Sequence, residues 1–223
     1  MLRGKPTGRL LRYKPETDEV DILASGIFFA NGIAVDKLNE EFVMVAETSY
    51  SRVLKYHLKG PKKGSIEIVG GMTLPGFPDG VDCDMPITST DSGGRTVTKC
   101  YAALPSARIP LCDILWSPFM SPRLEAILRT LILMVPKRFF PQVKRYGGVA
   151  ELLSYGNVPD GSELSLSSGS SSSTASVTRI HQDPTGENIK MITGVTVYDG
   201  KIYLGSLHND YIGVYDVDSS DVP

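Results

Sequence analysis

Apolar and polar residues alternate in short runs along most of the chain, and each run ends at a turn-forming sequence. Residues 9–13 alternate in this way and lead into the Pro-Glu-Thr-Asp sequence of residues 15–18, which is typical of a turn. Similar runs recur at residues 51–56, 175–180 and 210–215. Alternation with a period of two is typical of half-buried strands, so the pattern predicts an all-β fold.

Two further kinds of strand precede these runs in a recurring order. One kind begins at Gly32, Gly80 and Gly194, and the other is a more continuous apolar run, as at residues 42–46. Repeated units of several strands, spaced by ~40–50 residues, are typical of β-propeller blades. The repeats amount to about three to four blades, whereas propellers close with ~4–8. Because an open half-ring would expose strand edges, we expect the chain to be part of a longer propeller, and a small open fold is the alternative.

One segment departs from the strand pattern. Ser121 and Pro122 are typical of the cap and first position of a helix, and apolar residues then recur at helical spacing. We expect a helical insert over residues 113–146 and a flexible Ser-rich loop over residues 157–176. The amphipathic helix of residues 121–135 either packs over one mouth of the propeller or lies on a membrane surface. Its apolar face would comprise Leu124, Ile127, Leu128, Leu131, Ile132 and Val135.

Charge and composition limit the kinds of partner and cellular compartment that the sequence supports. The net charge of −2 over 223 residues gives no support for a nucleic-acid partner. The chain shows no signal peptide and no apolar run long enough to span a bilayer. Cys83, Cys100 and Cys112 are expected as buried thiols, with a disulfide between Cys83 and Cys100 as the alternative if they lie on neighbouring strands.

Asn31 and Asp79 hold the same place in two successive repeats, directly before the glycine that begins a strand. Oxygen ligands at equivalent strand ends can converge on a hard cation such as calcium. Asn-Gly and Asp-Gly are also turn dipeptides, so turn formation is the competing interpretation. Glu47 ends a strand, and we expect it to pair with Arg52 across a hairpin rather than to act in catalysis.

The three histidines are weak candidates for chemistry. We expect His57 on the outside of a blade and His181 at the opening of a turn. His208 lies at a connection between two strands, where it could face a tunnel mouth.

Several motifs are spaced along the chain, at residues 29–32, 45–48, 58–64, 74–79, 143–146 and 199–207. Together they resemble the motifs of the strictosidine synthase-like family. The insert helix and the residues after it look most like the branch that contains adipocyte plasma membrane-associated protein. The family has a six-bladed β-propeller, more distantly related to paraoxonases and gluconolactonases. The resemblance therefore implies that this chain supplies about the last three to four blades.

The resemblance also implies a function and a site. It implies a calcium ion in the central tunnel with Asn31 and Asp79 among its ligands, the others coming from blades outside this chain, so that the site is incomplete here. The implied activity of the full-length protein is arylesterase-like, metal-assisted hydrolysis of a small-molecule ester or lactone. Strictosidine-type condensation of an amine with an aldehyde is disfavoured, because Thr193 stands where that reaction uses a Glu and cannot shuttle its proton.

A third class of function is also open. It is a non-catalytic propeller that binds at a membrane surface, with residues 121–135 as its contact. The resemblance implies an endomembrane or membrane-associated location for the full-length family member, with any anchor in the N-terminal half that this chain lacks.

Overall fold

Antiparallel β-sheet is the main regular structure in the part of the chain that the computed structural model describes. That part comprises residues 5–69, 74–84, 87–90, 96–108, 121–134, 146–155, 175–183 and 185–216. The predicted all-β fold is confirmed. The strands are β1 (Gly8–Lys14), β2 (Glu19–Ile27), β3 (Ala30–Val35), β4 (Phe42–Glu47), β5 (Arg52–His57), β6 (Ile66–Ile68), β7 (Val81–Cys83), β8 (Ile87–Thr90), β9 (Thr96–Leu104), β10 (Gly147–Tyr155), β11 (Ala175–Asp183), β12 (Ile192–Tyr198), β13 (Lys201–Ser206) and β14 (Gly213–Asp216).

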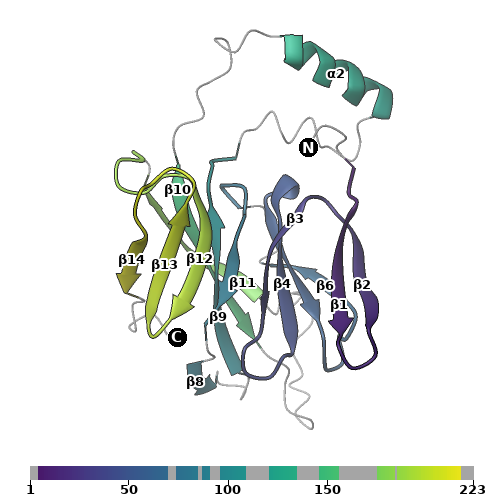
Figure 1. The fold of residues 1–223 in the computed structure, drawn as a ribbon, viewed down its shortest axis with the longest axis vertical. Helices are drawn as coiled ribbons and strands as arrows, with labels where there is room; N and C mark the ends of the chain where they lie inside the picture. The colour runs from purple at the N-terminus through teal and green to yellow at the C-terminus, as the bar shows by residue number, and fades with distance from the viewer. Residues whose placement is uncertain are drawn as a thin grey trace, which may run out of the picture.

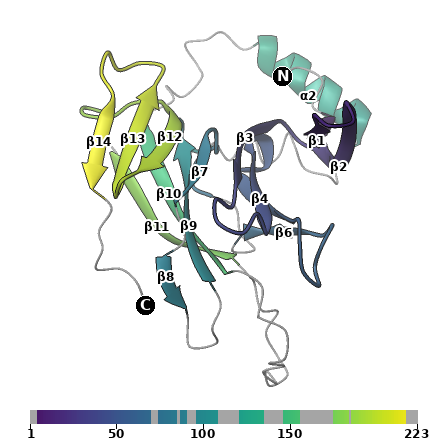
Figure 2. The same ribbon diagram turned by 60° about the horizontal axis from the view of Figure 1, so that its bottom comes forward.

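The strands form four sheets that follow one another in chain order. The first pairs β1 with β2, and the second has the order β3-β4-β5-β6. The third has the order β7-β9-β10-β11, with β8 also paired to β9, and the fourth has the order β12-β13-β14. Figures 1 and 2 show the sheets side by side like the blades of a propeller. Sheets of about four antiparallel strands, repeated around an axis, define β-propeller architecture.

The first strand of each of the last three sheets forms an inner row. Strand β7 lies next to both β3 and β12 (Figure 2), and backbone hydrogen bonds join the strand starts. The amide of Gly32 donates to the carbonyl of Asp79 (2.9 Å), and the amide of Gly80 donates to the carbonyl of Thr193 (2.8 Å). These bonds link three successive blades at one end of the inner row.

The core lies between the sheets rather than inside any one of them. One apolar cluster separates each pair of neighbouring blades. The middle strands β4, β9 and β10 are therefore buried on both faces. This explains the continuous apolar run of residues 42–46, since a strand buried on both faces has no polar side to alternate with.

Glu47 and Arg52 form the pair expected across the β4–β5 hairpin. They are directly opposite in the register, and Arg52 Nε lies 2.5 Å from Glu47 Oε2. The other carboxylate oxygen accepts a hydrogen bond of 2.7 Å from the amide of Phe28. Glu47 is almost completely buried, so its role is to join the hairpin to the β2–β3 connection.

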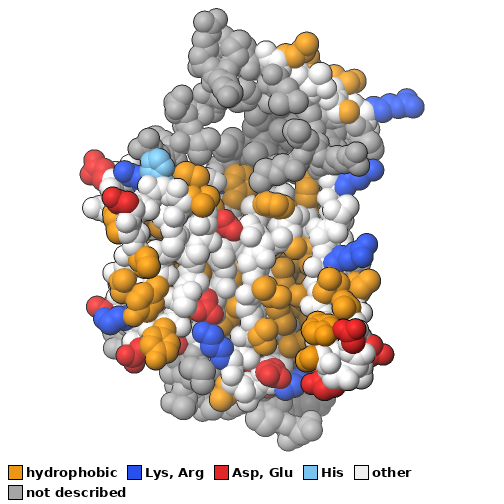
Figure 3. All heavy atoms as spheres, viewed as in Figure 1, with side chains coloured by type: hydrophobic (Ala, Val, Ile, Leu, Met, Phe, Trp, Pro, Cys, Tyr) orange, Lys and Arg blue, Asp and Glu red, His pale blue; other side chains and the backbone are white. Residues whose placement is uncertain are grey.

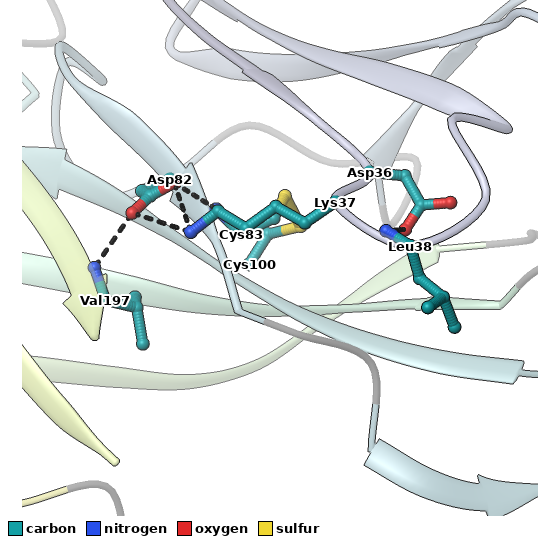
Figure 4. The surroundings of a disulfide bond; sticks show 7 residues. All are labelled: Asp36, Lys37, Leu38, Asp82, Cys83, Cys100 and Val197. Atoms are coloured by element: carbon teal, nitrogen blue, oxygen red, sulfur yellow. Dashed lines mark hydrogen bonds and ion pairs between the residues drawn. A yellow bond between two sulfur atoms is a disulfide. The ribbon is translucent and has the colours of Figure 1, made fainter. Parts of the chain in front are cut away.

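Cys83 and Cys100 form a disulfide (Figure 4). They face each other across the β7–β9 pairing, and both are fully buried. The preceding residue, Asp82, accepts hydrogen bonds from the amides of Val197 (2.8 Å) and Cys83 (2.9 Å), and lies 3.1 Å from Lys37 Nζ. Asp82 thus ties β7 to β12 and to the residues after β3. Cys112 lies outside the described residues.

The predicted insert helix is present as α2 (Pro122–Met134). The amide of Leu124 donates to Ser121 Oγ (3.3 Å), which confirms the expected cap. In Figure 1 the helix stands beyond one end of the sheets. Four apolar side chains on it are 55–75% exposed, so the described residues do not bury this stripe. They are Leu124, Ile127, Leu131 and Met134.

The predicted boundaries of the insert and loop are covered only in part. Residues 113–120, 135–145 and 157–174 lie outside the described part of the chain, and residues 175–176, expected in the Ser-rich loop, begin β11. No helix in the described ranges is long and apolar enough to cross a membrane.

Candidate functional site

Asn31, Asp79 and Thr193 occupy equivalent places in three successive blades. Each directly precedes a glycine near the start of β3, β7 or β12. Backbone hydrogen bonds at these glycines join one blade to the next, as described above. The blades therefore place the three side chains along one end of the inner row, which is the arrangement expected where a propeller tunnel opens.

Two of the glycines are required by the close approach of neighbouring backbones. A Cβ atom on Gly32 would lie 2.2 Å from the carbonyl oxygen of Asp79, and one on Gly80 would lie 2.6 Å from that of Thr193. No real Cβ contact is that short, so only glycine permits this spacing. At Gly194 the nearest atom would be 3.7 Å away, which is ordinary contact.

This difference predicts that two similar substitutions will differ in their effect on stability. We expect Gly32→Ala to lower the free energy of unfolding by about 1–3 kcal/mol, because the strands β3 and β7 must separate to admit the methyl group. Gly194→Ala is the matched control, and we expect a change within about 0.5 kcal/mol. Urea denaturation of both variants measures the difference. Equal stability of the two would contradict the close packing of β3 on β7.

A largely apolar pocket of about 580 Å³ opens at this end of the inner row. Its polar groups include Asn31 and Asp79, which the structure thus brings to one place. Three phenylalanines, Phe28, Phe29 and Phe77, contribute to its apolar surface. The lining residues are Thr7, Gly8, Phe28, Phe29, Ala30, Asn31, Thr48, Ser49, Phe77, Asp79, Pro105 and Ser106.

A small hydrogen-bond network orients the two candidate ligands. Burial raises the pKa of the Asp79 carboxyl group, and a hydrogen bond from Asn31 partly offsets that rise. The Thr48 hydroxyl donates to the carbonyl of Pro78 (2.7 Å), so it can only accept from Asn31 Nδ2 (3.4 Å). With its nitrogen turned toward Thr48 and Asp79, Asn31 keeps its amide oxygen available to a ligand.

The donor chemistry of Asn31 and Asp79 fits a calcium ion. An amide oxygen and a carboxylate are both hard donors, but calcium takes six to eight oxygens. Among the residues that the structure describes, no group of three or more His, Cys, Asp and Glu side chains is placed to hold a metal. These two residues would thus supply part of a ligand shell.

None of the three histidines, all of which are described, lines this pocket. His208 is exposed in the β13–β14 connection, where its amide donates to Ser206 Oγ (2.9 Å). The expectation that His57 lies on a blade exterior is wrong: it is buried at the end of β5, 3.4 Å from Glu67 Oε2, and burial lowers its pKa. His181 lies within β11 rather than in a turn.

Sequence reasoning missed the partners of the two candidate ligands. Thr48 and the pocket aromatics Phe28, Phe29 and Phe77 were not singled out as functional. Residues 29, 48 and 77 nevertheless fall within the motifs that carry the family resemblance.

The repeated sheets, the inner row and the polar strand starts define a portion of a β-propeller with a candidate site at one mouth. The family model for strictosidine synthase matches residues 1–61. Together with the relatives described next, this match shows that the chain belongs to the strictosidine synthase-like family.

The relatives come from plants and animals. The chain is 33% identical over 160 residues to strictosidine synthase-like protein 13 of Arabidopsis thaliana, covering 69% of this chain and 36% of that protein. It is 28% identical to strictosidine synthase-like protein 10 of the same plant, covering 97% of this chain and 49% of the relative. It is 30% identical to adipocyte plasma membrane-associated protein of Salmo salar, and the match covers 95% of this chain and 43% of that protein. The chain thus spans less than half the length of these relatives.

Proposed function

We propose that this chain contributes to a metal-assisted hydrolase that acts on small esters or lactones. The observation that carries the proposal is the meeting of Asn31 and Asp79 in one largely apolar pocket of about 580 Å³. A pocket of this size and character suits a small organic substrate. Two hard oxygen donors among its lining residues suit calcium.

In this proposal, several of the described residues have distinct roles. Asp79 would supply a charged oxygen and Asn31 a neutral one, and Thr48 would hold the Asn31 amide in place. A calcium ion bound there would polarise the substrate carbonyl and stabilise the oxyanion that forms. Phe28, Phe77 and neighbouring side chains would enclose the apolar part of the substrate. No described residue is assigned as the general base that would activate water.

Strictosidine-type condensation remains disfavoured on chemical grounds. Thr193 takes the place equivalent to Asn31 and Asp79, and a threonine hydroxyl does not exchange protons near neutral pH as a carboxyl group can. Membership of the family therefore describes the fold, and the reaction has to be argued from the residues present.

The test is an ester-hydrolysis assay on a protein that carries this chain at the length of its relatives. We expect turnover of phenyl acetate that stops when a calcium chelator is added and returns with excess calcium. A folded protein that binds no calcium and turns over no ester or lactone would contradict the proposal.

One observation favours a second candidate, a non-catalytic propeller that binds at a membrane surface. The apolar stripe of α2 is exposed, and Figure 3 shows hydrophobic side chains on the outside of this helix. Several animal relatives are named as plasma membrane-associated proteins. This candidate predicts binding to phospholipid vesicles in a protein that hydrolyses neither phenyl acetate nor lactones.

A further inference from the structure

A second, smaller cavity lies at the seam between the third and fourth blades, apart from the candidate calcium site. Its volume is about 90 Å³. On one side, Tyr101, Glu151 and Arg179 form a row of cross-strand neighbours on β9, β10 and β11. On the other side are residues of β13 and β14, including Tyr215.

Two tyrosine hydroxyls at this cavity are buried without a hydrogen-bond partner among the described residues. They belong to Tyr101, whose side chain is fully buried, and to Tyr215. Burial and the nearby Glu151 carboxylate raise the pKa of both phenols, so both remain neutral and able to donate. Buried polar groups are nearly always paired, and an unpaired one in a native protein points to a bound water or ion.

The two carboxylates that line the cavity already have partners. Glu151 lies 3.5 Å from His181 Nε2 and 3.9 Å from Lys99 Nζ, and it accepts a hydrogen bond of 3.1 Å from Thr178. Asp216 is paired with Lys201 at 2.5 Å. A charged ligand would disturb this balance, whereas a small neutral one that both donates and accepts hydrogen bonds would not.

We propose that this cavity is a binding site for ordered water that bridges Tyr101 and Tyr215 across the seam between the blades. A water molecule occupies about 30 Å³ of liquid, so the cavity has room for about three. Water held here joins β9 of the third blade to β14 of the fourth. This inference is independent of the proposed hydrolase function.

The removal of each hydroxyl tests the proposal by the sign of its effect. If water bridges the phenols, Tyr101→Phe and Tyr215→Phe each lower the melting temperature, and the double variant loses less than the sum of the two because they share one network. If the cavity is dry, each substitution removes an unpaired buried group and raises the melting temperature. Tyr198→Phe, whose ring is 71% exposed, is the control and should leave it unchanged.

A direct measurement keeps the proposal falsifiable even if the variants lose stability for another reason. Magnetic relaxation dispersion of ¹⁷O water on the full chain should show long-lived internal water. We expect its amplitude to fall in the double Tyr→Phe variant and to stay the same in Tyr198→Phe. An unchanged amplitude in the double variant, or a rise in melting temperature in either single variant, overturns the proposal.

Discussion

Replacing both Cys83 and Cys100 by alanine is expected to lower the free energy of unfolding by about 3 kcal/mol. The bond joins residues separated by 17 positions, and in its absence the unfolded chain regains the freedom that this loop had lost. In the folded state it fixes the short inner strand β7 to the middle strand β9. Urea denaturation of the double variant against the unmodified chain measures the change.

The third cysteine provides the control. Cys112→Ala leaves the Cys83–Cys100 pair intact, so dithiothreitol should lower the stability of this variant by as much as it lowers that of the unmodified chain. Dithiothreitol should shift the transition of the unmodified chain toward that of the double variant. If dithiothreitol and the double substitution both leave the transition where it is, the pair makes no stabilising bond.

The disulfide also indicates the redox environment in which the protein folds. Structural disulfides persist in oxidising compartments and are rare in the cytosol. A bond between two fully buried cysteines of the third blade therefore agrees with the endomembrane or membrane-associated location expected from the family. Sequence reasoning left this bond open, because it could place the two cysteines on neighbouring strands but not opposite each other. The register of β7 on β9 places Cys83 directly opposite Cys100.

The strands that sequence reasoning recovered are those with a visible pattern. Alternation located β1 and β5, and the glycine that opens each inner strand located β3, β7 and β12. These features are local, so they can be read from a few residues.

The strand β10 was missed, and its environment explains why. It pairs with β9 on one side and β11 on the other, and both of its faces are buried. Its sequence, Gly-Gly-Val-Ala-Glu-Leu-Leu-Ser-Tyr, therefore has no regular alternation, and its glycines and polar residues also break up the kind of continuous apolar run that located β4. The same effect made the placement of His57 wrong, because β5 is buried from Val53 to His57.

The candidate site was predictable only as far as repetition reveals it. Asn31 and Asp79 stand at equivalent places in the sequence, and equivalent places in successive blades come together around the propeller axis. The network around them was not predictable in this way. Thr48 meets Asn31 because β4 ends beside the start of β3, and Pro78 meets Thr48 only because two blades touch.

The substitution Asp79→Asn is expected to weaken calcium binding at least about 10-fold, since even residues that only support a metal ligand typically contribute 10–100-fold. The asparagine keeps the shape and one oxygen but loses the charge. Isothermal titration with calcium, on a protein that carries this chain at the length of its relatives, measures the change. Asp199→Asn is the matched control, because it alters an exposed Asp-Gly pair away from the pocket.

The same variant separates a metal ligand from a residue that only supports the fold. Burial raises the pKa of Asp79 in the folded state, so the folded protein favours the protonated carboxyl. Stability from this group is complete below the unfolded pKa and is lost as pH rises through the folded pKa. At neutral pH the ionised Asp79 therefore costs stability, and Asp79→Asn should melt no lower than the unmodified protein in the presence of chelator.

Calcium should reverse that order. The unmodified protein gains stability by binding calcium, whereas the Asp79→Asn variant gains little. The calcium affinity of the unmodified protein should also fall as pH is lowered through the raised pKa of Asp79, because the ligand must be ionised. The Asp79→Asn variant should lack this pH dependence. If Asp79→Asn instead lowers the melting temperature in chelator and leaves the calcium response intact, Asp79 serves the turn before β7 and the calcium site lies elsewhere.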